Sequence, residues 1–314
     1  MPQSEPDRNR QIRRLVSSTA AAAGLLLPVA AGAQELEPRA YSARPIGTNF
    51  IVAGYSRLSG EVLTDPSLPI ADVQAKIDVY SIGYLRSFAF FGRSASAGVI
   101  VPYVRADITG EVFDAAREAH RSSRGDLRLR FTTNLVGDPA VSPRAFAQRT
   151  PGTTVGASLS VVVPTGQYDP GRLINVGASR WAFKPEIGLA VPLGNWFADA
   201  SAGVWFFTDN NDFFPGGRNR GQHPLSVYQL HAGYNFGPGV WLAANAAFYS
   251  GGRTVVNGVE GSDVQQNSRV GVTLSLPLTS GWSAKIAWSR GVATRISGDF
   301  EVIAIALQYR WFDQ

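Results

Sequence analysis

Alternation of hydrophobic and polar residues is the dominant pattern along this chain. Segments of about ten residues alternate between two faces and are separated by turn signals, which is typical of β-strands. Arg128 and Arg130, for example, share one face of a segment whose other face carries Leu127, Leu129 and Phe131. We expect twelve strands, near residues 49–60, 75–90, 95–110, 125–137, 153–163, 182–192, 196–208, 226–236, 240–250, 264–276, 282–290 and 300–312.

The lengths of the connections favour a membrane barrel. Short turns follow the second, sixth, eighth and tenth predicted strands, and the connections after odd-numbered strands are longer. Outer-membrane barrels show this alternation of short periplasmic turns and long external loops. The connection 138–152 is long where a short turn is expected, and we predict a short periplasmic helix in it. The sequence thus predicts an all-β, transmembrane antiparallel β-barrel of about 12 strands over residues 49–314. A soluble sandwich also alternates, so periodicity alone leaves that alternative open.

Tryptophans mark one level of the predicted barrel. Trp196, Trp241 and Trp282 directly follow short turns, and Trp311 ends the last strand. Indoles gather where lipid headgroups meet hydrocarbon. Trp196, Trp282 and Trp311 share a face with apolar neighbours, whereas Trp241 is out of phase with Leu242. Tryptophans that fill the core of a sandwich are the alternative reading.

The start of the chain predicts export. A basic cluster at 8–14 precedes the uncharged stretch 15–29 and the small residues Ala31, Gly32 and Ala33. This order indicates a secretory signal peptide over 1–33, followed by a periplasmic N-terminal segment, 34–48. A membrane anchor is the alternative, but the hydrophobic core is shorter than the ~20 apolar residues that a spanning helix needs. We expect the outer membrane of a Gram-negative bacterium.

Composition narrows the chemistry. With 45% hydrophobic and 17% charged residues and no cysteine, the chain is neither disordered nor a disulfide scaffold. Its balance is mildly basic without a block of lysines or arginines, so no nucleic-acid partner is expected. Three histidines and one methionine leave little for metal or nucleophilic chemistry. The run 209–212 lacks the spacing of a calcium loop. We therefore predict no enzyme, no catalytic residues, no metal and no cofactor.

Strand parity predicts the residues that line the lumen. If the apolar face of each strand meets lipid, the opposite face turns inward. The candidate lumen or transport-pathway residues are Arg128, Arg130, Lys184, Glu186, Asp199, Trp205, Phe207, His231, Arg269, Lys285 and Arg310. Basic groups outnumber acidic ones, which would favour anions such as aromatic carboxylates. Two alternatives remain: the arginines pair with Glu186 and Asp199 in a packed lumen, and Trp205 and Phe207 belong to an aromatic girdle.

Several segments between Pro164 and Phe312 carry a family resemblance. They are Pro164-Thr165-Gly166-Gln167-Tyr168, the run Asn175 to Glu186, Trp205 to Asn210, Val256-Asn257-Gly258 and Gln266-Asn267-Ser268-Arg269. With them the chain resembles the transporter family labelled "MetA-pathway of phenol degradation", a set of exported bacterial barrels. The resemblance implies uptake of aromatic compounds and supplies no catalytic residues.

These observations lead to one functional hypothesis and two alternatives. We expect an outer-membrane β-barrel transporter or channel for small organic solutes, including aromatic compounds or their carboxylates. A structural or partner-binding barrel without transport is the first alternative, and a barrel hydrolase the second. The expected partners are outer-membrane lipid, a small organic solute and the barrel assembly machinery, which reads an aromatic residue near the chain end such as Phe312.

Overall fold

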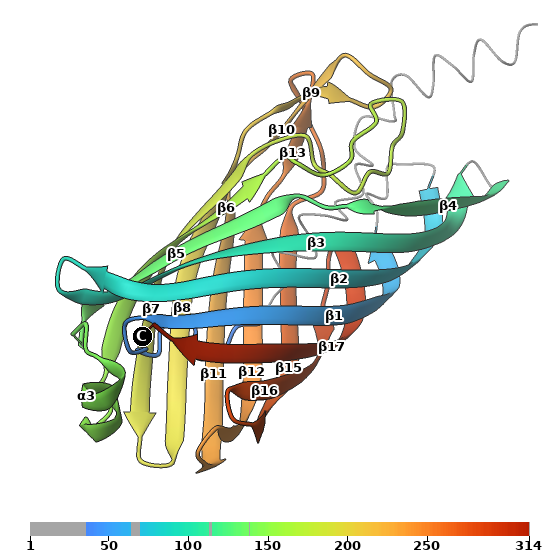
Figure 1. Ribbon diagram of the computed structural model, residues 1–314. Coiled ribbons are helices and arrows are strands. Elements are labelled where there is room, and N and C mark those ends of the chain that lie inside the picture. The colour runs from blue at the N-terminus through green and yellow to red at the C-terminus, as the bar shows by residue number, and fades with distance from the viewer. Residues whose placement is uncertain (1–35, 64–69, 113–114, 138, 314) are drawn as a thin grey trace, which may run out of the picture.

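The protein folds as a closed antiparallel barrel. The computed structural model describes residues 36–63, 70–112, 115–137 and 139–313, so the signal peptide predicted at 1–33 lies outside the described residues. Twelve strands form the barrel wall (Figure 1). They are β1 (Thr48–Leu63), β2 (Ile70–Phe90), β3 (Arg93–Val112), β5 (Leu127–Val136), β6 (Thr154–Val163), β7 (Ala182–Leu193), β8 (Trp196–Phe207), β11 (Leu225–Gly237), β12 (Val240–Gly251), β15 (Gln265–Thr279), β16 (Trp282–Ala293) and β17 (Ser297–Phe312).

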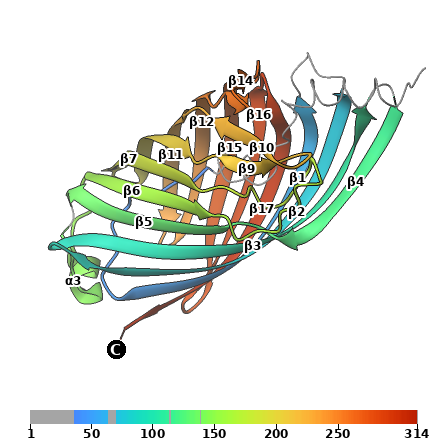
Figure 2. The same cartoon turned by 90° about the horizontal axis from the view of Figure 1, so that it is seen from above.

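Pairing of the first and last barrel strands closes the ring. β1 pairs with β17 over its whole length, from Thr48 opposite Phe312 to Leu63 opposite Ser297. Each other wall strand pairs with its two neighbours, and the view from above shows the resulting ring (Figure 2). Closure satisfies the backbone groups that an open sheet edge would leave unpaired, which lipid cannot do. The predicted fold and strand number are confirmed.

The outward face is an apolar band between aromatic side chains. Exposed residues in the middle of the strands include Ile187, Leu230, Val272 and Ile305. At the end with the short turns, exposed and half-buried aromatic side chains form a girdle comprising Trp196, Tyr234, Phe236, Trp282, Tyr309 and Trp311. The prediction for Trp196, Trp282 and Trp311 is confirmed. A band of this kind matches a hydrocarbon layer with interfaces at both sides.

The short-turn end of the barrel also carries a helix. In the connection 138–152, α3 (Pro143–Gln148) follows Ser142, whose Oγ accepts a hydrogen bond from the Ala145 amide at 3.4 Å. The serine cap and the proline in the first turn explain why this segment is helical. The predicted short helix is thus present. Among the described residues, no helix has the length and apolar character needed to cross a membrane.

The long-loop end contains more strands than predicted. The region 113–124, expected as a loop, includes β4 (Ala115–Arg124), which pairs with the outer part of β3 and projects beyond the wall (Figure 1). A small four-stranded sheet lies above the barrel in the connections 209–225 and 251–263. It contains β9 (Asn210–Phe213), β10 (Arg218–Gln222), β13 (Thr254–Val256) and β14 (Val259–Glu260). These loop predictions were wrong because β9, β10, β13 and β14 are only two to five residues long, and β4 carries polar residues on both faces.

The interior is filled differently at its two ends. Near the long-loop end, two apolar clusters occupy the inner face, one around Leu58, Ile108 and Phe300 and the other around Trp205 and Tyr249. Toward the short-turn end, a smaller apolar cluster around Phe197 and Trp241 lies beside the polar groups that bind the N-terminal segment.

The N-terminal segment enters the barrel. Residues 36–47 turn back into the lumen from the start of β1, where Glu37, Arg39 and Tyr41 bond to inward-facing side chains. The sequence pattern predicted a periplasmic N-terminal segment over 34–48, and its periplasmic location stays a prediction. Residues 37–41 of this segment lie within the barrel wall, where their polar groups find partners.

Candidate functional site in the barrel lumen

Tyr41 fixes the N-terminal segment to the barrel wall. Its side chain is 3% exposed and covers Gly156 of β6 and Gly188 of β7, which face each other across the two strands. A Cβ added at Gly188 would lie 2.1 Å from Tyr41 Cε2, and one added at Gly156 would lie 2.5 Å from Tyr41 Cδ1. The two glycines have no side chains, so they leave a slot on the inner face of the wall that accommodates the Tyr41 ring.

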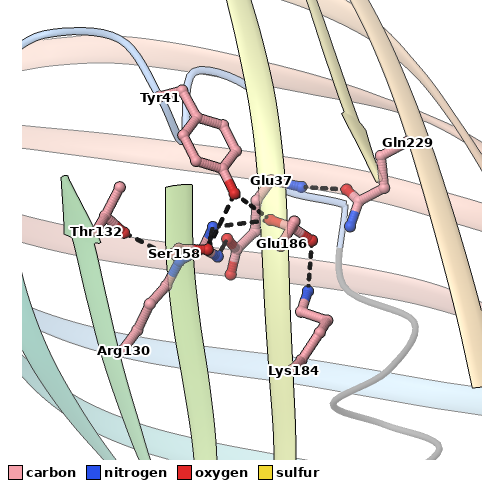
Figure 3. Close-up of polar contacts among 8 residues, drawn as sticks. All are labelled: Glu37, Tyr41, Arg130, Thr132, Ser158, Lys184, Glu186 and Gln229. Atoms are coloured by element: carbon pink, nitrogen blue, oxygen red, sulfur yellow. Dashed lines mark hydrogen bonds and ion pairs between the residues drawn. The ribbon is translucent and has the colours of Figure 1, made fainter. Parts of the chain in front are cut away.

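A polar cluster surrounds the Tyr41 hydroxyl (Figure 3). The hydroxyl donates to Glu186 Oε1 at 2.7 Å and lies 2.9 Å from Ser158 Oγ. Arg130 reaches the same Glu186 oxygen at 3.0 Å, and Lys184 Nζ reaches Oε2 at 2.8 Å. Glu186 therefore receives two cations and a phenol. This satisfies a buried carboxylate, which would be costly if left unpaired.

Glu37 extends this cluster from the N-terminal segment. Its carboxylate forms an ion pair with Arg130, and its backbone amide donates to Gln229 Oε1 at 3.3 Å (Figure 3). Burial raises the pKa of the Glu37 carboxyl, but the charges of Arg130 and the lumen lysines outweigh that effect, so the pKa lies below its ordinary value. For the Tyr41 phenol, burial and the Glu186 charge raise the pKa. At neutral pH, Glu37 is thus an anion and Tyr41 a hydrogen-bond donor.

Arg39 connects the segment to the next strands along the wall. Its backbone amide donates to Asp199 Oδ2 at 2.8 Å and its guanidinium to Asn235 Oδ1 at 2.9 Å. The guanidinium also lies 4.7 Å from the ring centre of Phe197 and 5.7 Å from that of Trp241. Residues 37–41 thus contact five consecutive wall strands, β5, β6, β7, β8 and β11.

Two cavities flank the N-terminal segment. The larger, about 840 Å³, opens toward the short-turn end and is lined by Arg39, Lys285 and Arg310 among others. The smaller, about 260 Å³, is lined by Arg128, Arg130, Lys184 and Trp205 among others. Glu37, Ala40 and Arg44 contribute to the lining of both cavities. The segment is therefore a shared wall between two parts of one lumen.

The structure places the predicted lumen residues on the inner face and brings some of them together. Arg130, Lys184 and Glu186 form the cluster around Tyr41. Asp199 binds Arg39, while His231 contacts Asn245 Oδ1 at 2.8 Å. Arg269 lies apart and donates to the Phe300 carbonyl at 2.6 Å. The remaining predicted residues line the two cavities or stack beside them: Arg128, Trp205, Phe207, Lys285 and Arg310.

Three aromatic side chains, those of Trp205, Phe207 and Trp241, lie on the inner face of the barrel. Trp205, 4% exposed, and Phe207 stack on the inner face with ring centres 6.4 Å apart, so they are not part of a lipid-facing girdle. Trp241, which sequence parity placed out of phase, is 6% exposed and lines the larger cavity. The register of β11 against β12 shifts between Asn235 and Gly237, next to this residue.

The charged lumen residues fall into ion-paired residues and cavity-lining residues. Arg130 and Lys184 pair with Glu186, as the packed alternative expected. Other basic residues line cavities, and the N-terminal segment adds Glu37, Arg39 and Arg44, which parity did not indicate. Nothing in the sequence pattern of 34–48 marks these residues, because the segment has no strand periodicity.

The closed wall, the apolar band and the charged lumen define a membrane-spanning β-barrel of the outer-membrane type. Residues 58–300 match the model of the family described as "Putative MetA-pathway of phenol degradation", and the chain belongs to that family. No curated protein matches the sequence.

A solved outer-membrane channel shares the fold. The COG4313 outer membrane channel from Pseudomonas putida F1 superposes with a TM-score of 0.77 at 20% identity, over 88% of this chain and 100% of that one, and at this identity the similarity concerns the fold. The β domain of the Bordetella autotransporter Brka gives a TM-score of 0.49 at 14% identity, over 85% and 100% of the two chains.

Proposed function

We propose that the protein is an outer-membrane channel for small organic solutes and that its lumen favours anions, aromatic carboxylates in particular. The observation that carries this proposal is the charge of the cavity walls. Arg39, Arg44, Lys285 and Arg310 line the larger cavity, against the carboxylates of Glu37 and Asp199. Water-filled spaces with an excess of one charge concentrate ions of the opposite sign.

Aromatic side chains beside the cations support an aromatic solute. Trp205 lines the smaller cavity together with Arg128 and Lys184, and Lys184 Nζ lies 5.5 Å from the Trp205 ring centre. An aromatic carboxylate would meet a ring face and a cation at once in such a wall. The family description, with its reference to phenol degradation, agrees with this solute class, and the fold shared with the outer membrane channel from Pseudomonas putida F1 supports a channel.

Planar-bilayer recording tests the proposal. We expect discrete conductance steps and, across a salt gradient, a reversal potential with the sign of anion preference. Replacing chloride by benzoate on one side should maintain a measurable anion current. A barrel that inserts but does not conduct, or that prefers cations, would contradict the proposal.

A closed barrel without transport is the second candidate. The N-terminal segment favours it, because residues 37–41 lie inside the lumen and bond to inward-facing side chains of five consecutive wall strands. Liposome swelling in small organic solutes separates the candidates, since a closed barrel gives no swelling.

A further inference from the structure

Two buried arginines lie near each other at the long-loop end, outside both cavity linings. Arg180 precedes β7 and is 2% exposed, and Arg220 on β10 is 6% exposed. Nε and Nη1 of Arg180 and Nε and Nη2 of Arg220 have no hydrogen-bond partner among the described residues. A buried guanidinium with unused donors is costly. Four nitrogen atoms of the pair therefore lack a hydrogen-bond acceptor among the described residues.

The acidic residues that act on this pair, Asp126, Asp209 and Asp263, accept hydrogen bonds from other groups. Asp209 accepts from the Asn219 side-chain amide at 3.0 Å. Asp126 accepts hydrogen bonds from the amides of Gly166 and Ala178, each at 2.9 Å. Asp263 accepts from the Thr254 amide at 2.9 Å and from its hydroxyl at 2.7 Å. Within the described part of the chain, no carboxylate forms a salt bridge with either arginine; Arg180 Nη2 contacts the neutral Gln222 side chain. The positive charge of the pair thus has no direct counter-charge from the protein.

The electrostatic environment agrees with that geometry. Burial lowers the pKa of the Arg180 guanidinium well below its ordinary value, and the charge of Arg220 lowers it further. Burial also lowers the pKa of Arg220. Because arginine stays protonated in proteins, these shifts reflect the cost of burying the two guanidiniums, to which the charge of Arg220 adds at Arg180. A bound anion would relieve that cost.

Rings and cations continue from the pair toward the smaller cavity. The Arg180 guanidinium carbon lies 4.5 Å from the Phe207 ring centre, and Phe207 stacks on Trp205 with an angle of 17° between the rings. Trp205 and Lys184 line the smaller cavity. Along this row, a planar anion would meet the cationic group of Arg180, the stacked rings of Phe207 and Trp205, and then the cationic group of Lys184.

We propose that Arg180 and Arg220 bind the carboxylate of a small organic anion, as its first binding site between the long-loop end and the smaller cavity. The unused donors of two guanidiniums suit the two oxygens of a carboxylate. The inference rests on the proposed function, since the anion it names is the solute class of the channel.

Equilibrium dialysis of the full chain in detergent micelles with labelled benzoate tests the site. We expect saturable binding that weakens at least tenfold in Arg180→Gln and in Arg220→Gln. Arg172→Gln is the matched control, because this exposed arginine in the loop before β7 pairs with Asp169 at 2.9 Å, and it should bind like the wild type. Phenol, which lacks the carboxylate, should not distinguish these variants.

Folding of the variants is checked by heat-dependent gel mobility. Replacing a buried unpaired charge by a neutral amide removes a desolvation cost, so we expect folded barrels. Arg180→Lys keeps the charge with fewer donors and should bind with intermediate affinity. Unchanged benzoate binding in folded Arg180→Gln and Arg220→Gln would overturn the site, as would inorganic phosphate that binds more tightly than benzoate. Benzoate binding without conductance would contradict the proposed channel function but not the binding site. Conductance without binding at this pair would contradict the binding site but not the channel function.

Discussion

The slot that holds Tyr41 allows a direct test of the N-terminal segment as an obstruction of the lumen. In Gly188→Ala, the new Cβ would lie 2.1 Å from Tyr41 Cε2, and the ring is backed by the facing Gly156. Because the added Cβ is fixed to the backbone of β7, the Tyr41 ring has to move out of the slot. Tyr41→Phe is the milder change, because it keeps the ring and removes the hydroxyl that bonds to Glu186 and Ser158.

The magnitudes follow from these contacts. A hydrogen bond to a charged group contributes ~1.5–3 kcal/mol, and each 1.4 kcal/mol is about a factor of ten in an equilibrium. Tyr41→Phe should therefore raise the displaced fraction of the segment by about 10- to 150-fold. Gly188→Ala should displace it in most molecules, since the loss of packing of a buried aromatic ring adds to the loss of both hydrogen bonds.

Thiol labelling measures the displacement. The chain has no cysteine, so Ala40→Cys introduces a single thiol on the wall between the two cavities. We expect labelling to accelerate in the order wild type, Tyr41→Phe, Gly188→Ala. Gly237→Ala is the control, because nothing lies within 4 Å of an added Cβ there. Equal labelling rates in a folded Gly188→Ala barrel would show that Tyr41 does not hold the segment.

Three further outcomes are expected. The protein should fractionate with the outer membrane and show heat-dependent gel mobility; recovery as a soluble periplasmic protein would contradict the barrel in cells. Lys285→Gln combined with Arg310→Gln should reduce the anion preference of the reversal potential, while Arg290→Gln, on the opposite face of β16, should not. Acidification should release the segment: the pKa of Glu37 is lowered from 4.5, so its docking free energy is present above that value and is lost as pH falls through the lowered pKa. A labelling rate of the Ala40→Cys variant that stays constant on acidification until the barrel itself unfolds would contradict this role.

Strand alternation predicted the wall because the membrane imposes it. Every wall strand has lipid on one side, so its outward positions must be apolar, and this period of two is visible in the sequence. The predicted lumen side of Arg130, Lys184 and Glu186 follows from the same parity. Which of these residues meet was not predictable, because contacts between β5 and β7 depend on strand register and tilt.

The N-terminal segment could not be predicted from its own residues. Tyr41 and Glu186 are 145 positions apart in the chain, and the slot exists only once Gly156 and Gly188 stand opposite each other. In the sequence these are ordinary strand glycines. A close approach of another backbone or side chain is one reason for glycine within a strand. Two inward-facing glycines on neighbouring strands are therefore a signal of such a contact, but it becomes visible only once the strand register is known.

Displacement of the N-terminal segment should change the ion selectivity of the lumen together with its width. The segment brings Arg39, Arg44 and Glu37 into the lumen, and Glu37 pairs with Arg130. When it leaves, the lumen loses two cations and one anion, and the charge of Arg130 loses one of its two partners. The wider lumen would therefore carry a smaller excess of positive charge, and more water would screen it. Gly188→Ala should thus raise conductance and lower anion preference in the same channels. A rise in conductance with unchanged selectivity would mean that the charges that set the preference lie on the wall and not on the segment.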